Sequence, residues 1–250
     1  MNQYFSFASF CALIEKRWPE LLTELLRHVD MTVLALLFSL AVGIPLGILI
    51  TYSRTASRIA IGIANVMQSV PCIALLALSV CFLGIGTAPA ILMVFVYALL
   101  PILKNTYTGI MSVSPVHLEV ARGIGLTRLR CLLKVELPIA APFIMAGIRI
   151  AAVSAVGTMT IAAFAGAKGL GWFINLGLNS LNVEMILLGA IPVSLLALVV
   201  DFIFANLEQA LTSEGLLPPE QIRNLPKAVI RRRKIISIGV CLALVCLAIM

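Results

Sequence analysis

The stretch M-T-V-L-A-L-L-F-S-L-A-V-G-I-P-L-G-I-L-I-T-Y, from Met31 to Tyr52, contains no charged side chain over its whole length. A helix that crosses a bilayer needs about 20 consecutive, mainly apolar residues, because the hydrocarbon core is roughly 30 Å thick. Gly43, Pro45 and Gly47 punctuate the stretch and are interpreted as kinks or close-packing positions. The stretch therefore predicts a membrane-spanning helix.

Comparable apolar stretches recur along the rest of the chain, separated by segments that carry most of the charges. Two of these stretches are short. Ala88–Leu103 is a short span, and Met1–Ile14 is short enough to lie at the membrane interface instead of crossing it. After Met31–Tyr52, the predicted spans are Ile59–Leu83, Ala88–Leu103, Ile139–Phe164 and Met185–Asn206, with a sixth at Ile235–Met250 and an interfacial helix at Met1–Ile14.

The composition of the 250 residues supports this interpretation, because 61% are hydrophobic and only 12% are charged. A soluble domain is typically about half apolar and about one quarter charged. The chain therefore has too few charges to cover a soluble surface. The predicted fold class is all-α, as a polytopic membrane protein.

The basic residues indicate how the spans are oriented. Thirteen of the 18 Lys and Arg residues fall on one side if five spans alternate, namely after the first span, between the third and fourth, and after the fifth. Basic residues concentrate on the cytoplasmic side of inner-membrane proteins. This pattern predicts a multi-pass protein of the bacterial inner membrane with its N-terminus outside. It also accounts for the net charge of +7 without a nucleic-acid partner.

The chain is expected to divide into four segments. Residues 1–28 form an extracytoplasmic or interfacial segment, and residues 29–212 form the transmembrane domain, which includes one large cytoplasmic loop at 105–137. Residues 213–234 form a basic cytoplasmic linker, and residues 235–250 form the C-terminal span.

Motifs for bond-making chemistry are missing from the sequence. There is no GxxxxGK[ST] loop for nucleotide phosphates and no HExxH zinc motif. His28 and His117 are the only histidines, and the six cysteines form no CxxC pair. Buried small hydrophobic residues are the expected role of the cysteines. We therefore expect no enzyme activity, no metal site and no directly bound cofactor.

The loop between the third and fourth spans carries the most specific motif. From Glu119 to Pro138 it reads E-V-A-R-G-I-G-L-T-R-L-R-C-L-L-K-V-E-L-P. It resembles the EAA loop of ABC importer permeases, with Val120 and Val135 as mild departures from that pattern. Ser114 and Pro115 are typical of a helix start, with Ser114 as a candidate cap, and Gly125 is expected to break the helix. The resemblance assigns contact with an ATPase to Glu119, Ala121, Arg122, Gly125, Leu126, Leu137 and Pro138.

The resemblance extends over about residues 67–208 to the osmoprotectant branch of these importers, which takes up glycine betaine, carnitine and choline. The runs that carry it include Gln68–Pro71, Leu83–Thr87, Tyr97–Ile110, Ile144–Arg149 and Gly166–Gly171. Lys168 departs from the glycine expected at its position.

This resemblance implies a five-span, type I importer core that transports a betaine-like or quaternary-amine solute. It implies ABC ATPase subunits as partners, which bind ATP and Mg²⁺. It also implies a second permease copy, identical or paralogous, and an extracytoplasmic substrate-binding protein or fused binding domain. Alternatives remain open: the same architecture importing an amino acid or a betaine-type thiol compound, or an ion-coupled secondary transporter. The last predicts intramembrane carboxylates and inverted repeats, and Asp201 is the only clear candidate carboxylate.

Candidates for the transport pathway are polar or aromatic residues inside the spans. Aromatic rings attract quaternary ammonium groups, and the wider set includes Phe95, Trp172 and Thr160. The predicted pathway residues are Gln68, Tyr97, Thr158 and Phe164. Arg149 and Asp201 are charged residues inside spans, so we expect them to form either a gate or a structural ion pair.

Overall fold

The computed structural model describes residues 7–211, and this part of the chain is helical with no β-strand. The predicted linker 213–234 and sixth span Ile235–Met250 lie outside the described residues. The elements in chain order are α1 (Phe7–Leu49), a 3₁₀ turn (Ile50–Tyr52), α2 (Arg54–Ser69), α3 (Cys72–Leu83), α4 (Thr87–Met111), α5 (Pro115–Gly123), α6 (Arg128–Cys131), a π-helical turn (Leu132–Glu136), α7 (Leu137–Met159), a 3₁₀ segment (Thr160–Ala165), α8 (Leu170–Asn179) and α9 (Val183–Leu211).

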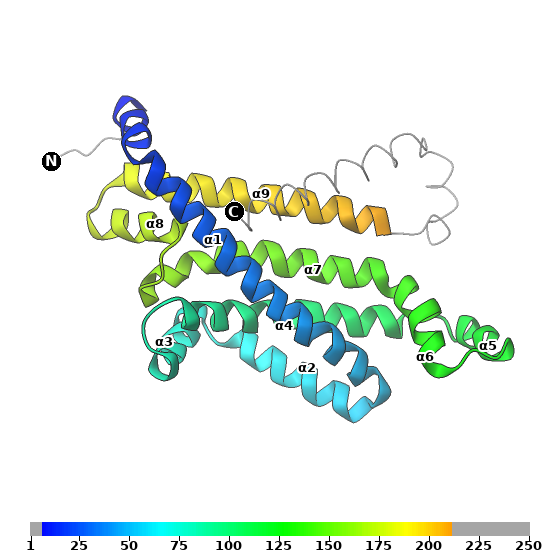
Figure 1. Cartoon of the computed structure of the whole chain (residues 1–250). Helices are drawn as coiled ribbons and strands as arrows, with labels where there is room; N and C mark the ends of the chain where they lie inside the picture. The colour runs from blue at the N-terminus through cyan, green and yellow to red at the C-terminus, as the bar shows by residue number, and fades with distance from the viewer. Residues whose placement is uncertain (1–6, 212–250) are drawn as a thin grey trace, which may run out of the picture.

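Four helical stretches are long and apolar enough to cross a membrane, and the bent pair α2–α3 is a fifth candidate. Figure 1 shows α4, α7 and α9 running side by side, with α1 crossing over them. The short helices α5 and α6 protrude at one end of this bundle, and α3 and α8 lie at the opposite end. The predicted all-α, multi-span fold is confirmed.

The first helix is longer than the sequence predicted. An interfacial helix at Met1–Ile14 and a separate span from Met31 were expected, but α1 runs without a break from Phe7 to Leu49. The charged residues between the two apolar stretches do not end the helix, because a continuous stripe at helical spacing is buried and most of the charged side chains lie outside it. This stripe consists of Leu21, Glu24, His28, Met31, Ala35, Ser39, Gly43 and Gly47.

The second predicted span is not a single helix. The stretch Ile59–Leu83 is broken between Ser69 and Cys72, and α2 and α3 meet at an angle of 98°. Pro71 lacks a backbone N–H and disfavours the helical conformation of the residue before it. Val70 accordingly adopts extended backbone angles. The other predicted spans correspond to α4, α7 and α9, and α4 continues beyond its predicted end to Met111.

Close packing at glycines brings α1 and α7 onto α4. A Cβ atom at Gly43 would lie 2.8 Å from Ile102 Cγ2, and one at Gly147 would lie 2.6 Å from Asn105 Cβ and 2.8 Å from the Pro101 carbonyl oxygen. Small residues at such crossings let helix backbones approach each other inside a membrane.

We expect Gly147→Ala to lower the free energy of unfolding by about 1–3 kcal/mol, the usual cost of overpacking, because the backbone of α4 blocks the added methyl group. Gly157→Ala is the matched control, since Gly157 lies on the same helix and its Cβ position has no neighbour within 4 Å. Thermal unfolding of the purified protein in detergent measures both. Equal melting temperatures for the two variants would contradict the close approach of α4 and α7.

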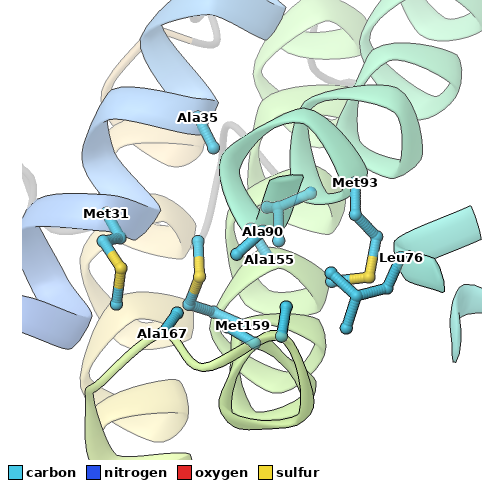
Figure 2. Packing of buried hydrophobic residues seen from close by; sticks show 11 residues of the cluster. Met31, Ala35, Leu76, Ala90, Met93, Ala155, Met159 and Ala167 are labelled. Atoms are coloured by element: carbon cyan, nitrogen blue, oxygen red, sulfur yellow. The ribbon is translucent and has the colours of Figure 1, made fainter. Parts of the chain in front are cut away.

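The main core cluster joins α1, α3, α4 and α7 to the loop that precedes α8 (Figure 2). The cluster combines small alanines with methionines, whose flexible side chains fill irregular gaps. Met31 of α1 lies beside Ala167 of the loop and Met159 of α7. The core thus fixes the position of the loop at 166–169 relative to α1.

Candidate functional site

The α5–α6 hairpin, residues Pro115–Cys131, lies beyond the end of the helical bundle (Figure 1). Pro115 occupies the first turn of α5, as the sequence predicted. The predicted cap is wrong, because the Ser114 side chain makes no capping hydrogen bond. Its backbone carbonyl accepts instead from the N–H of His117 at 3.0 Å.

Gly125 ends the first helix of this hairpin, as predicted. Its φ of +80° places it in the left-handed region, which glycine adopts without steric cost. The N–H of Leu126 donates to the Ala121 carbonyl at 3.0 Å, and the N–H of Gly125 donates to the Arg122 carbonyl at 2.9 Å. These two bonds form a Schellman motif, which satisfies the carbonyl groups at the end of the helix.

The surface of the hairpin combines charged and apolar side chains. Glu119 and Arg122 are exposed, whereas Ala121 is buried, with 3% of its surface accessible. Large apolar residues without cover usually mark an interaction site. Those exposed on the hairpin are Val116, Val120, Ile124 and Leu129.

Leu137 and Pro138 lie in the first turn of α7, but the chain is already helical from Arg128. The π-helical turn Leu132–Glu136 joins α6 to α7. A proline ring clashes with the carbonyl four residues earlier. For Pro138 that residue is Lys134, which lies inside the wider π turn. The predicted start of the fourth span at Ile139 is therefore late, because one helical path leads from the hairpin into the span.

A second contact connects the hairpin to the bundle. The guanidinium carbon of Arg128 lies 4.6 Å from the centroid of the Tyr52 ring, at the turn between α1 and α2. A cation over an aromatic face is attracted by the ring quadrupole. Movement of α6 would therefore reach both α7 and the α1–α2 turn.

Two of the predicted pathway residues meet at the break in the second span. The Tyr97 hydroxyl donates to the Val70 carbonyl, and the Gln68 amide donates to the Tyr97 carbonyl at 3.3 Å. Thr158 instead donates to the Ser154 carbonyl of its own helix at 2.9 Å, and Phe164 is exposed in the 3₁₀ segment after α7.

The charged residues Arg149 and Asp201 are brought together, as expected for an ion pair. Arg149 Nε and Nη2 donate to the two carboxylate oxygens of Asp201 at 2.7 and 2.9 Å, and Nη1 donates to Glu208 Oε2 at 3.4 Å. The three side chains line a cavity of about 500 Å³ between α7 and α9. Glu208 lies seven residues after Asp201, a spacing that places both side chains on one face of α9.

Glu24 had no predicted role, and His28 was interpreted from the sequence as a polar anchor at the membrane interface and not as a ligand. Both are buried on the inner stripe of α1, with 5% and 0% of their surface accessible, and both bond to segments far along the chain. Within residues 7–211, no three His, Cys, Asp or Glu side chains gather closely enough to hold a metal ion.

Comparison with known proteins confirms the resemblance. Residues 43–213 match the family described as binding-protein-dependent transport system inner membrane component. The chain is 43% identical to the choline transport system permease protein OpuBB of Bacillus subtilis, over 79% of this chain and 91% of that protein. It is 44% identical to the carnitine transport permease protein OpuCB of Listeria monocytogenes, over 78% and 90%.

Solved structures confirm the fold. Inward-facing conformations of the MetNI methionine ABC transporter match with a TM-score of 0.67 at 22% identity, over 84% of this chain and 100% of that chain. An amino acid ABC transporter matches with a TM-score of 0.69 at 17% identity, over 83% and 99%. The chain therefore belongs to the family of binding-protein-dependent transport system inner membrane components.

Proposed function

We propose that this permease carries a betaine-like or quaternary-amine solute into the cell as part of an ATP-driven importer. The observation that carries the proposal is the 43% and 44% identity to permeases named for choline and carnitine, each covered over at least 90% of its length. The identity to amino acid transporters of known structure is below 25%, which supports the shared fold but not a shared cargo.

The α5–α6 hairpin is the proposed docking site for a separate ATPase subunit, which binds ATP and Mg²⁺. Its exposed apolar side chains provide a surface that a partner would bury. Glu119, Arg122 and the Gly125 cap define its shape, while Leu126, Leu137 and Pro138 connect it to α7. Closure of the ATPases would push the hairpin and, through α7, the spans.

The orientation follows from this assignment. The hairpin end of the bundle is cytoplasmic, and the end with α3 and α8 faces outward (Figure 1), where a substrate-binding protein or fused binding domain delivers the solute. A second permease copy would complete the pathway. Arg149 and Asp201 support this, because side chains that are 35% and 41% exposed inside a span require water or protein beside them.

The pathway within each permease is proposed to pass the break between α2 and α3, where Gln68 and Tyr97 meet, and to continue toward Thr158 and Phe164. The ion-coupled alternative is less well supported. A coupling carboxylate must bind and release an ion, whereas Asp201 is held by two hydrogen bonds from Arg149.

Proteoliposomes that contain the permease, its ATPase and the binding protein test this proposal. We expect uptake of radiolabelled choline, carnitine or glycine betaine that requires all three components and hydrolysable ATP, with methionine as the control cargo. Uptake that continues without the ATPase, or that follows an imposed ion gradient, would contradict it.

A further inference from the structure

Glu24 and His28 lie one helical turn apart on the buried stripe of α1, and each bonds to a residue more than 120 positions later in the sequence. The Gly169 N–H donates to Glu24 Oε2 at 2.5 Å. His28 Nε2 lies 3.1 Å from the Val156 carbonyl oxygen, and because a carbonyl only accepts, the imidazole donates this bond. These contacts join α1 to the loop at 166–169 and to the end of α7.

The Val156 carbonyl is available because the helix changes type there. The N–H of Thr160 bonds to the Gly157 carbonyl instead of to Val156, as the chain tightens from α-helix to 3₁₀-helix. His28 satisfies the carbonyl that this change releases. A buried polar group without such a partner would be costly, so the imidazole and the change of helix type support each other.

Gly169 brings the loop close to the same stripe. Its φ is +119°, and a Cβ atom there would lie 3.2 Å from Met31 Cε and 3.4 Å from His28 Nδ1. Gly169 also caps α8, so the Glu24 carboxylate lies at the positive end of the helix dipole. Arg27 Nη1 bonds the other carboxylate oxygen at 2.8 Å. Figure 2 shows Met31 beside Ala167 of this loop.

We propose that Glu24 and His28 are positioning residues that hold the loop at 166–169 against α1, and that this α1 latch must open when the outer end of the permease opens. The proposal rests on the proposed function. The latch residues lie before residue 43, where the family match begins. The latch would keep the permease in the arrangement described here until the loaded binding protein docks.

The ATPase rate without binding protein tests the latch. In the proposed cycle, closure of the ATPases around ATP drives the outer end open, so weakening the latch should make this closure more frequent. In the full complex in nanodiscs, Glu24→Ala and His28→Leu should each raise this basal rate by up to about tenfold, the factor that roughly one buried hydrogen bond contributes to an equilibrium. The maximal rate with binding protein and solute should not change.

Conservative variants separate the hydrogen bonds from packing. Glu24→Gln keeps an oxygen for the Gly169 N–H, and His28→Gln keeps a donor near the Nε2 position, so both should show smaller increases. Glu20→Ala is the matched control: Glu20 lies one turn earlier, and its carboxylate pairs with Arg17 on the exposed face. It should leave the basal rate unchanged.

A basal rate in Glu24→Ala and His28→Leu equal to that of Glu20→Ala would overturn the latch. So would a parallel fall of basal and stimulated rates in all four variants, which is the result expected of a purely structural role. If binding protein fails to stimulate the wild-type complex, the proposed function fails instead, so the two failures are distinguishable.

Discussion

Replacing Gly125 with valine is expected to reduce ATP-dependent uptake to the level of proteoliposomes that lack the ATPase. Gly125 has a φ of +80°, and a β-branched residue is strained in this region. The valine would displace the two hydrogen bonds that end α5 at Ala121 and Arg122. The hairpin would then present its exposed residues to the ATPase in a different arrangement.

Two neighbouring substitutions isolate the backbone conformation from side-chain bulk. Gly123→Val adds the same side chain two residues earlier, at the last position of α5, where φ is not positive; the Cβ positions of both glycines are open. Gly125→Asn places a residue that tolerates the left-handed region at the critical position. Both should retain most of the uptake that Gly125→Val loses.

Two quantities are measured: ATP-dependent uptake of the solute by proteoliposomes, and the amount of ATPase that co-purifies with the permease. Gly125→Val should still insert and fold, because a Cβ at this position meets nothing within 4 Å. Wild-type uptake in Gly125→Val would show that the Schellman motif is not needed for coupling. Equal losses in Gly123→Val and Gly125→Val would assign the effect to bulk on the hairpin surface.

The parts of the fold that depend on local apolar length were predictable from the sequence. The spans around α4, α7 and α9 could be placed because a run of apolar residues either is or is not long enough to cross a membrane. The glycine that ends α5 could be placed as well, since a left-handed helix end requires a particular residue type.

The parts that depend on tertiary partners were not predictable. Pro71 was visible as a helix breaker, but its 98° bend depends on how α3 packs at the end of the bundle. Glu24 and His28 lie in a charged segment that suggested a solvated interface. Their burial results from bonds to Gly169 and Val156, more than 120 residues away in the sequence, and no local pattern reports such bonds.

The second large effect concerns the ion pair between α7 and α9. Arg149→Leu should lower the stability of the folded permease by about 1–3 kcal/mol, because it leaves the carboxylates of Asp201 and Glu208 beside the apolar spans without their guanidinium partner. A fully buried pair would lose roughly 3–5 kcal/mol. The smaller figure applies because Arg149 and Asp201 are 35% and 41% exposed and therefore partly screened.

A double-mutant cycle separates the structural from the gating role of this pair. Arg149→Leu should lower the melting temperature more than the double variant does, because the double variant also removes the Asp201 carboxylate that the single variant leaves without its guanidinium partner. Asp201→Leu completes the cycle, and in it Arg149 keeps the 3.4 Å bond to Glu208. Ser154→Ala is the control, since Ser154 lines the same cavity and its hydroxyl bonds only to its own helix, at 3.0 Å. Additive losses in the cycle would contradict the coupling that the two short hydrogen bonds predict.

Uptake by the double variant then decides between the two roles. A structural pair can be replaced by two leucines with little loss of transport, because packing between α7 and α9 is kept and neither Arg149 nor Asp201 is left as a single charge. The Glu208 carboxylate, which is 29% exposed, remains beside them. A gate must break and re-form its hydrogen bonds in each cycle, so the same leucines would leave a stable but inactive permease. The bidentate geometry, with both carboxylate oxygens engaged, favours the structural role. We therefore expect the double variant to retain uptake at a level near that of the wild type.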